Sequence, residues 1–500
     1  MKYFFLCLLF TIRAFAQPAS LPFRPNQPIT TEALRADFRL LRASLEELHP
    51  SLYRYSPKDS LNQAFDRAYA SLTYPLTEQE FMNRLYPVIS RIRCGHTQIE
   101  HSTAYKQTPD RPKSVALPVK LLAEGNRLFI VQNQSTEASL QAGEEVLSIN
   151  GITAAELVQE ARQHWSSDGY NETWVQFFIN NYGLLNDVCT FLHGWRGTYT
   201  LQVKNAKGTV RTTTVMAPPP ARLLDTSVSR SQIMPVKPAR SRWEPKPYLG
   251  LRLMPDSATA LLTVNALEYG DDTFYQQAFG QIEKKRIQHL ILDIRQNHGG
   301  DARIISQLLG YLADAPFVLI KSVESSVANP DRNRFRPYFD KTILDSHRTS
   351  FLPGIRQGSL YQFTFRPENG RITGYLPLAK ANRFRGKVYV LIDGGTFSNG
   401  ANFAAALKAQ RSNTVFVGRE TGGTEAGCNG GTVQRLTLPH SKLQVQFPWM
   451  RLTSASAQPD SGYGVRPDFA VLPTPRALAN GRDEDLETAL GLIRTGDKKP

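Results

Sequence analysis

Apolar residues recur at helical spacing near the start of the chain, where they mark a series of amphipathic helices. A first helix is predicted from Thr31 to about Pro50, because a proline interrupts helical hydrogen bonding. A second is predicted at 61–72, and Thr77 opens a third with the spacing of a capping box. We therefore expect an N-terminal helical domain at residues 17–105, or a helical arm that packs on the core. The apolar positions of the first helix are Leu34, Phe38, Leu41, Leu45 and Leu48.

The next segment changes to short apolar runs that are typical of β-strands. Two such runs cover 117–121 and 127–132, and a third, at 143–151, ends in Asn-Gly, a strong turn signal. A helical pattern follows at 154–161. The run Gly-Glu-Glu-Val-Leu-Ser-Ile-Asn-Gly resembles the corresponding run of PDZ domains, so residues 112–216 are expected to form a PDZ-like domain. PDZ domains bind peptides at a sheet edge, and both a peptide-binding and a spacer role stay open.

A Pro-rich segment separates this part from the rest of the chain. Residues 217–247 predict a semi-rigid linker. From 248 to 495 strands and helices alternate, which is the pattern of an α/β domain. Within that domain, residues 320–380 form a long polar insertion, and loops of such length are usually functional or mobile.

The first sixteen residues have the pattern of a secretory signal peptide. Lys2 precedes an apolar stretch at 3–12 that is too short to span a bilayer. Ala14-Phe15-Ala16 has the small-x-small form of a cleavage site, so residues 1–16 are expected to be removed. We expect an exported protein, periplasmic or extracellular, without an integral membrane span after cleavage. A retained membrane anchor is the alternative.

Charge and cysteine content exclude several classes of protein. The formal net charge is +15, and loss of Lys2 and Arg13 with the signal peptide lowers it by two. The basic residues are scattered among acids and form no nucleic-acid motif, so no nucleic-acid partner is expected. Without Cys7 three cysteines remain, at spacings that match no zinc site. No metal or organic cofactor is expected, and the oligomeric state is left open.

Two buried strands that end in glycine-rich turns carry the strongest chemical signal. One is the run Leu-Ile-Leu-Asp-Ile-Arg-Gln-Asn-His-Gly-Gly at 290–300, and the other ends in Gly-Gly-Thr-Phe-Ser-Asn-Gly at 394–400. A helical pattern follows each, so the two turns are expected to meet at one edge of a sheet. A serine at such a turn lies at the positive end of a helix dipole, where a nucleophile and an oxyanion hole can form. A simple helix cap is the alternative.

These corners together resemble the tail-specific (C-terminal processing) serine proteases, a family that includes the tricorn core protease and the interphotoreceptor retinoid-binding protein. The resemblance continues through Gly-Arg-Glu-Thr-Gly-Gly at 418–423 and Gly-Val-Arg-Pro-Asp at 464–468. It implies an α/β fold in which residues 248–495 form a ClpP/crotonase-like catalytic core of ββα units. The helical domain and the PDZ-like domain would precede that core.

The resemblance also assigns roles to single residues. It makes Ser398 the nucleophile, with the backbone amides of Gly300 and Asn399 as the oxyanion hole. Many members use a lysine base, but Thr424 holds that position here, so a serine–lysine dyad is not expected. The tricorn-like branch uses a histidine instead. The Cys-Gly-His-Thr run around His96 resembles its Asp-Gly-His-Thr segment, so His96 is the expected general base.

A carboxylate is expected to orient the imidazole. Asp460 is the nearest acid to the family's glutamate, although the aligned position holds a serine, and Glu420 and Glu425 are alternatives. Asp293 and Arg295 are expected to hold the strand edge together, and we expect His298 in a surface loop rather than in contact with substrate.

The resulting hypothesis is an exported serine peptidase that forms an acyl-enzyme on Ser398 and acts on a peptide or protein substrate. Two alternatives stay open. One is a non-catalytic protein on the same fold that binds a hydrophobic ligand or a peptide, and the other is a hydrolase of small esters or amides.

Overall fold

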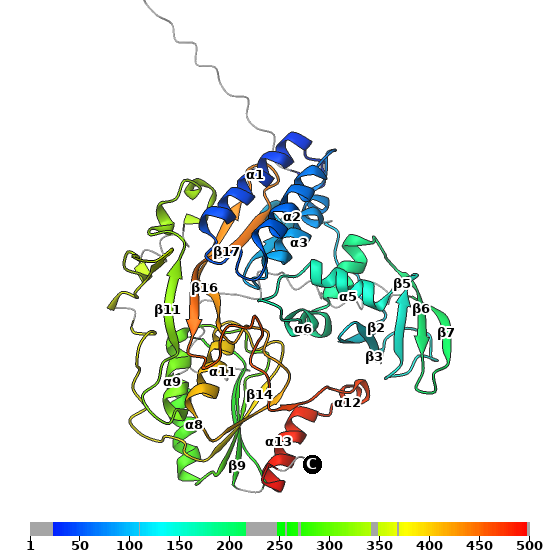
Figure 1. Ribbon diagram of the computed structural model, residues 1–500. Helices are drawn as coiled ribbons and strands as arrows, with labels where there is room; N and C mark the ends of the chain where they lie inside the picture. The colour runs from blue at the N-terminus through cyan, green and yellow to red at the C-terminus, as the bar shows by residue number, and fades with distance from the viewer. Residues whose placement is uncertain are drawn as a thin grey trace, which may run out of the picture.

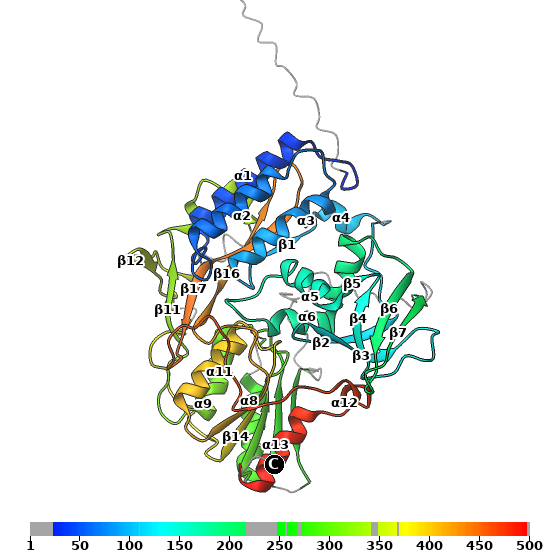
Figure 2. The ribbon, with the colours of Figure 1, turned by 45° about the vertical axis from the view of Figure 1, so that its right-hand side comes forward.

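The computed structural model describes residues 24–109, 111–216, 248–255, 258–268, 272–341, 349–367 and 370–497. Three β-sheets with their helices pack together, as Figure 1 and Figure 2 show from two directions. The expected signal peptide and the Pro-rich linker lie outside the described residues. Among the described helices, none combines the length and apolar character that a membrane span requires.

The core is a mixed α/β layer around a six-stranded sheet with the order β18-β15-β14-β10-β9-β8. All neighbouring strands are parallel except β8 and β9. Side chains alternate between the faces of a strand. Leu290 and Leu292 therefore pack on the side of α8, α9 and α11, whereas Ile291 packs on the side of α13. The strands are β8 (Leu249–Leu253), β9 (Thr259–Val264), β10 (His289–Asp293), β14 (Lys387–Ile392), β15 (Thr414–Gly418) and β18 (Phe469–Ala470). The helices are α8 (Asp272–Lys284), α9 (Ala302–Leu312), α11 (Asn399–Gln410) and α13 (Glu484–Thr495).

The N-terminal helices do not fold on a core of their own. Their apolar faces pack against the hairpin of β16 (Gly427–Thr437) and β17 (Gln444–Ser454), which reaches up beside α1 in Figure 1. The short strand β1 (Gln98–Glu100) pairs with β17. Thr77 and Glu80 form the expected capping box. The helices are α1 (Thr31–Leu48), α2 (Lys58–Ala70), α3 (Glu78–Ile89) and α4 (Thr103–Gln107).

The insertion predicted at 320–380 contributes strands to the second sheet, which contains β1, β16 and β17. β11 (Ile320–Ser325) pairs with β17, and β13 (Leu360–Gln362) pairs with both β11 and β12 (Ile355–Gln357). Part of the insertion therefore builds the sheet that supports the N-terminal helices.

The third sheet has the order β2-β3-β4-β6-β7, with β5 beside β4. This strand order with flanking helices is consistent with a PDZ-like domain. The C-terminal segment returns to it, because α12 (Pro475–Ala479) contacts β3, as Figure 2 shows. The strands are β2 (Val119–Glu124), β3 (Arg127–Asn133), β4 (Glu145–Ile149), β5 (Ile152–Thr153), β6 (Thr198–Lys204) and β7 (Val210–Met216). The helices are α5 (Ala154–Gln163), α6 (Thr173–Tyr182) and α7 (Leu184–Asp187).

Candidate active site

Ser398 lies on the sharp turn that joins β14 to α11. Its backbone has φ 52° and ψ −126°, a conformation that costs strain for a residue with a side chain. Ser398 is the N-cap of α11, yet its hydroxyl makes no capping hydrogen bond. The helix-cap alternative therefore does not describe this serine, whose side chain stands on a strained turn at a helix N-terminus.

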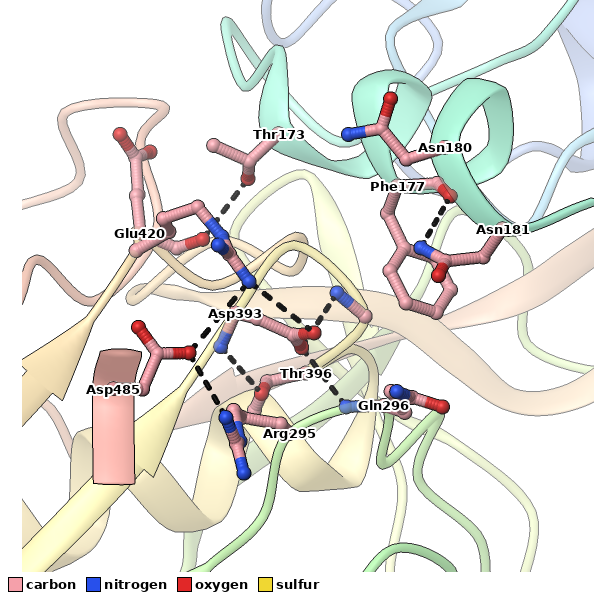
Figure 3. Close-up of polar contacts among 12 residues, drawn as sticks. Thr173, Phe177, Asn180, Asn181, Arg295, Gln296, Asp393, Thr396, Glu420 and Asp485 are labelled. Atoms are coloured by element: carbon pink, nitrogen blue, oxygen red, sulfur yellow. Dashed lines mark hydrogen bonds and ion pairs between the residues drawn. The ribbon is translucent and has the colours of Figure 1, made fainter. Parts of the chain in front are cut away.

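A buried carboxylate and a threonine hold this turn against the loop that follows β10 (Figure 3). Asp393 Oδ1 accepts hydrogen bonds from the amides of Gln296, at 2.8 Å, and Gly395, at 2.9 Å. The hydroxyl of Thr396 donates to the carbonyl oxygen of Ile294 at 2.9 Å. Because these bonds join the two glycine-rich corners directly, the position of the nucleophile depends on both strands.

Charged groups reinforce the same edge of the sheet. Arg295 forms ion pairs with Asp293 at 2.8 Å, with Asp483 at 2.7 Å and with Asp485 at 3.0 Å. Asp293 and Arg295 thus have the structural role expected of them, and Arg295 also anchors the start of α13. Burial raises the pKa of the Asp393 carboxyl, while the nearby Arg419 opposes that shift.

The glycine-rich turn at 299–300 lies directly against the turn that carries Ser398. A Cβ atom on Gly299 would lie 2.8 Å from the amide nitrogen of Asn399, and one on Gly300, where φ is 137°, would lie 2.1 Å from the carbonyl oxygen of Leu267. Only glycine fits these positions. The Gly299 amide donates to Asn297 Oδ1, whereas the amides of Gly300 and Asn399 have no hydrogen-bond partner within the described residues. Those two amides are available to bind an oxyanion.

His96 reaches the nucleophile from a tight loop between α3 and β1. Arg93 begins the loop in a left-handed conformation, with φ 58°, and a Cβ atom on Gly95 would lie 2.7 Å from the ring of Phe397. The Nε2 atom of His96 lies 3.1 Å from Ser398 Oγ. Two residues that are 302 positions apart in the sequence therefore lie within hydrogen-bond distance, which is the geometry that a base–nucleophile pair requires.

The environment of His96 favours its neutral form. The residue is 4% exposed, and burial lowers the pKa of its imidazole to about 4. Its Nδ1 atom is buried and has no hydrogen-bond partner within the described residues. Neutral imidazole is the form that can accept a proton from the serine.

The three acids considered from the sequence each contact other groups. Asp460 accepts hydrogen bonds from Arg54, at 2.7 Å from Nε, and from Tyr55, at 3.1 Å. Glu420 accepts from the amide of Gly464 and from the side chain of Asn171. Glu425 accepts from the hydroxyl of Ser456. The structure thus places Asp460 with Arg54 and Tyr55 rather than on His96.

Two buried thiols lie beside His96 and Ser398, and no sequence motif connects these thiols with the two residues. Cys94 precedes the Gly95-His96 pair, and Cys428 on β16 interacts with Ser398 and with Asn402. Burial raises the pKa of both thiols, that of Cys94 to about 12, so both stay protonated. Nothing in the sequence pattern links position 428 to the turn, because their proximity follows from the path of β16.

His298 differs from its expected place in a surface loop. It is half-buried and packs against the rings of Trp174 and Phe177 of α6. Burial lowers the pKa of its imidazole to about 4. Within the described part of the chain, no three His, Cys, Asp or Glu side chains gather as potential metal ligands.

Comparisons with known proteins agree with this geometry. The family model of peptidase family S41 matches residues 258–471. The crystal structure of mature CPAF is 14% identical, and the match covers 93% of this chain and 98% of that chain with a TM-score of 0.61. A structure of mature CPAF complexed with lactacystin is 15% identical, covers 93% and 99%, and has the same TM-score of 0.61. At these identities the likeness shows a shared fold.

A photosystem II D1 C-terminal processing protease is 13% identical, and the match covers 92% of this chain and 97% of that chain. Its TM-score of 0.40 is too low to support a conclusion. No curated protein matches the chain. The family match includes both glycine-rich turns, that of Ser398 among them, and it assigns residues 258–471 to peptidase family S41.

Proposed function

We propose that this protein is an exported peptidase that hydrolyses peptide bonds through an acyl-enzyme on Ser398, with His96 as the general base. The match of residues 258–471 to peptidase family S41 supports a serine-type peptidase. The observation that carries the proposed mechanism is the 3.1 Å contact between His96 Nε2 and Ser398 Oγ. The signal-peptide pattern at residues 1–16 supports export.

The proposed reaction has two halves. Ser398 Oγ attacks the carbonyl carbon of the peptide bond while its proton passes to His96 Nε2, and the amides of Gly300 and Asn399 bind the oxyanion. The proton on His96 then passes to the leaving amine as the C–N bond breaks, which leaves the acyl group on Ser398. In the second half a water molecule gives a proton to His96 while its oxygen attacks the ester carbon. The bond between that carbon and Ser398 Oγ then breaks, the proton on His96 returns to Oγ, and the carboxylic acid leaves.

The test is labelling of the purified mature protein with a fluorophosphonate, which reacts with activated serines. Wild type should be labelled, and both S398A and H96A should lose the label. H101A is the matched control, because burial also lowers the pKa of His101, whose Nδ1 contacts Glu78 Oε1 at 2.9 Å. A folded wild type that takes no label would contradict the proposal, as would undiminished labelling of H96A.

A substrate panel separates the proposed peptidase from the alternative hydrolase. Peptides and small acyl esters should be compared by kcat/KM in wild type and S398A. Hydrolysis of esters without any hydrolysis of peptides would contradict the proposed substrate class. CPAF shares this fold and has a structure in complex with lactacystin. Lactacystin is therefore a second probe to test on this protein.

A further inference from the structure

The 164–172 loop joins α5 to α6 and runs between the loop of the general base and the core. On the first side, the amide of Gly95 donates to Asp168 Oδ1 at 2.7 Å, and the amide of Gly169 donates to the carbonyl oxygen of Arg93 at 3.0 Å. These bonds fix the backbone immediately before His96. The loop of the general base therefore depends on the 164–172 loop for its position.

The opposite side of the 164–172 loop is bound to the core. The amide of Tyr170 donates to the carbonyl oxygen of Gly462 at 2.7 Å, and Asn171 Nδ2 donates to the carbonyl oxygen of Thr421 at 2.8 Å. A Cβ atom on Gly169 would lie 2.2 Å from the Gly462 oxygen, so the two segments are in direct contact. The loop thus ties the segment of the base to the core segments that contain Thr421 and Gly462.

Of the two acidic residues of this loop, Asp168 is buried and Glu172 is exposed. Asp168 is 3% exposed, and its second oxygen, Oδ2, is buried without a hydrogen-bond partner within the described residues. Burying a carboxylate oxygen without a hydrogen-bond partner costs free energy. Unpaired buried acids of this kind are more frequent at functional sites than elsewhere.

The charge of Asp168 acts on groups beside the catalytic pair. Burial raises the pKa of its carboxyl to about 7, against the hydrogen bond from Gly95 and the charge of Arg54. In addition to burial, its negative charge raises the pKa of the Cys94 and Cys428 thiols and of the Tyr55 hydroxyl. Cys94 lies two residues before His96 and Cys428 interacts with Ser398, so both thiols that feel this charge are next to the pair.

We propose that Asp168 is a positioning residue for His96: it fixes the base through the Gly95 amide, and its negative charge balances the positive charge that His96 acquires from Ser398. It would take the part that the sequence assigned to Asp460, but from the 164–172 loop and without touching the imidazole itself. The inference rests on the proposed function, because it presupposes that His96 accepts the proton of Ser398.

The test is the rate of fluorophosphonate labelling between pH 5.5 and 8.5 in wild type and D168N. Asparagine keeps the acceptor for the Gly95 amide and removes the charge. Wild type should label faster as the pH rises through about 7, and D168N should lack this rise. At pH 8 the variant should be slower by roughly tenfold or more, and with a peptide substrate the loss should appear in kcat rather than in KM.

Loss of folding cannot produce this result. A carboxyl whose pKa rises from 3.8 in the unfolded chain to about 7 in the folded one loses its stabilising contribution as the pH passes 7. The Tm of D168N at pH 8 should therefore equal or exceed that of wild type. D187N is the matched control, because burial also raises the pKa of Asp187 to about 7 and Asp187 lies on α7. It should leave the labelling rate unchanged.

Three outcomes would overturn the inference. Wild type could label at a constant rate from pH 5.5 to 8.5, which needs no variant to observe. D168N could match wild type at every pH, or D187N could lose as much as D168N. If folded wild type takes no label at all, the proposed function fails instead, so the two failures are distinguishable.

Discussion

The strongest quantitative prediction concerns the acid limit of the labelling reaction. The perturbation is a decrease in pH, which protonates His96 and removes the acceptor for the Ser398 proton. An exposed histidine titrates near 6.5, but burial lowers the pKa of His96 to about 4. This difference favours the neutral imidazole by about 3 kcal/mol.

The size of the effect follows from the populations of neutral imidazole. At pH 5.5 a base with a pKa near 4 is about 97% neutral, whereas a base with a pKa of 6.5 is about 9% neutral. In D168N, which lacks the carboxyl expected to titrate near 7, the labelling rate at pH 5.5 should therefore stay within about twofold of the rate at pH 7.5 if burial controls His96. An unperturbed histidine would lose about tenfold over the same range.

The assay is the rate constant of fluorophosphonate labelling from pH 3.5 to 7.5, with circular dichroism at each pH to show that the protein is folded. D168N is the suitable background, because it lacks the carboxyl expected to titrate near 7. A midpoint near 4 is expected. A tenfold lower rate at pH 5.5 in folded D168N would refute the reasoning, because it would mean that burial does not suppress the charge of His96.

Two further predictions concern the sheet edge beneath the site. G300A should slow labelling by about 100-fold or more, because the new methyl group would lie 2.1 Å from the Leu267 oxygen and displace an oxyanion donor; wild-type rates in this variant would contradict the assigned oxyanion hole. R295A should lower the free energy of unfolding in urea by about 3 kcal/mol, since it removes the ion pairs to Asp293 and Asp483 and leaves the buried Asp485 with only Arg419, at 3.8 Å. R482A removes an exposed, solvent-screened ion pair and should cost much less stability than R295A, and equal losses in the two variants would contradict this ranking.

The local elements of the fold were predictable from the sequence, because their causes lie within a few residues. The spacing of Leu34 to Leu48 predicted α1, and the capping box at Thr77 predicted the start of α3. The two strand-and-glycine corners predicted β10, β14 and the turn of Ser398. Periodicity and turn chemistry are short-range properties, so a linear pattern is enough to recognise them.

Which side chains meet was decided by the tertiary structure. His96 could be named from its motif, but its 3.1 Å contact with Ser398 spans 302 residues and depends on the packing of the N-terminal helices against β16 and β17. Asp460, close to the family's motif in sequence, lies with Arg54 and Tyr55 instead. Asp168 stands in a polar loop with no motif and became significant only through its bond to Gly95. Such long-range contacts depend on how separate elements bury their apolar faces together. No local sequence pattern specifies which distant residues will meet.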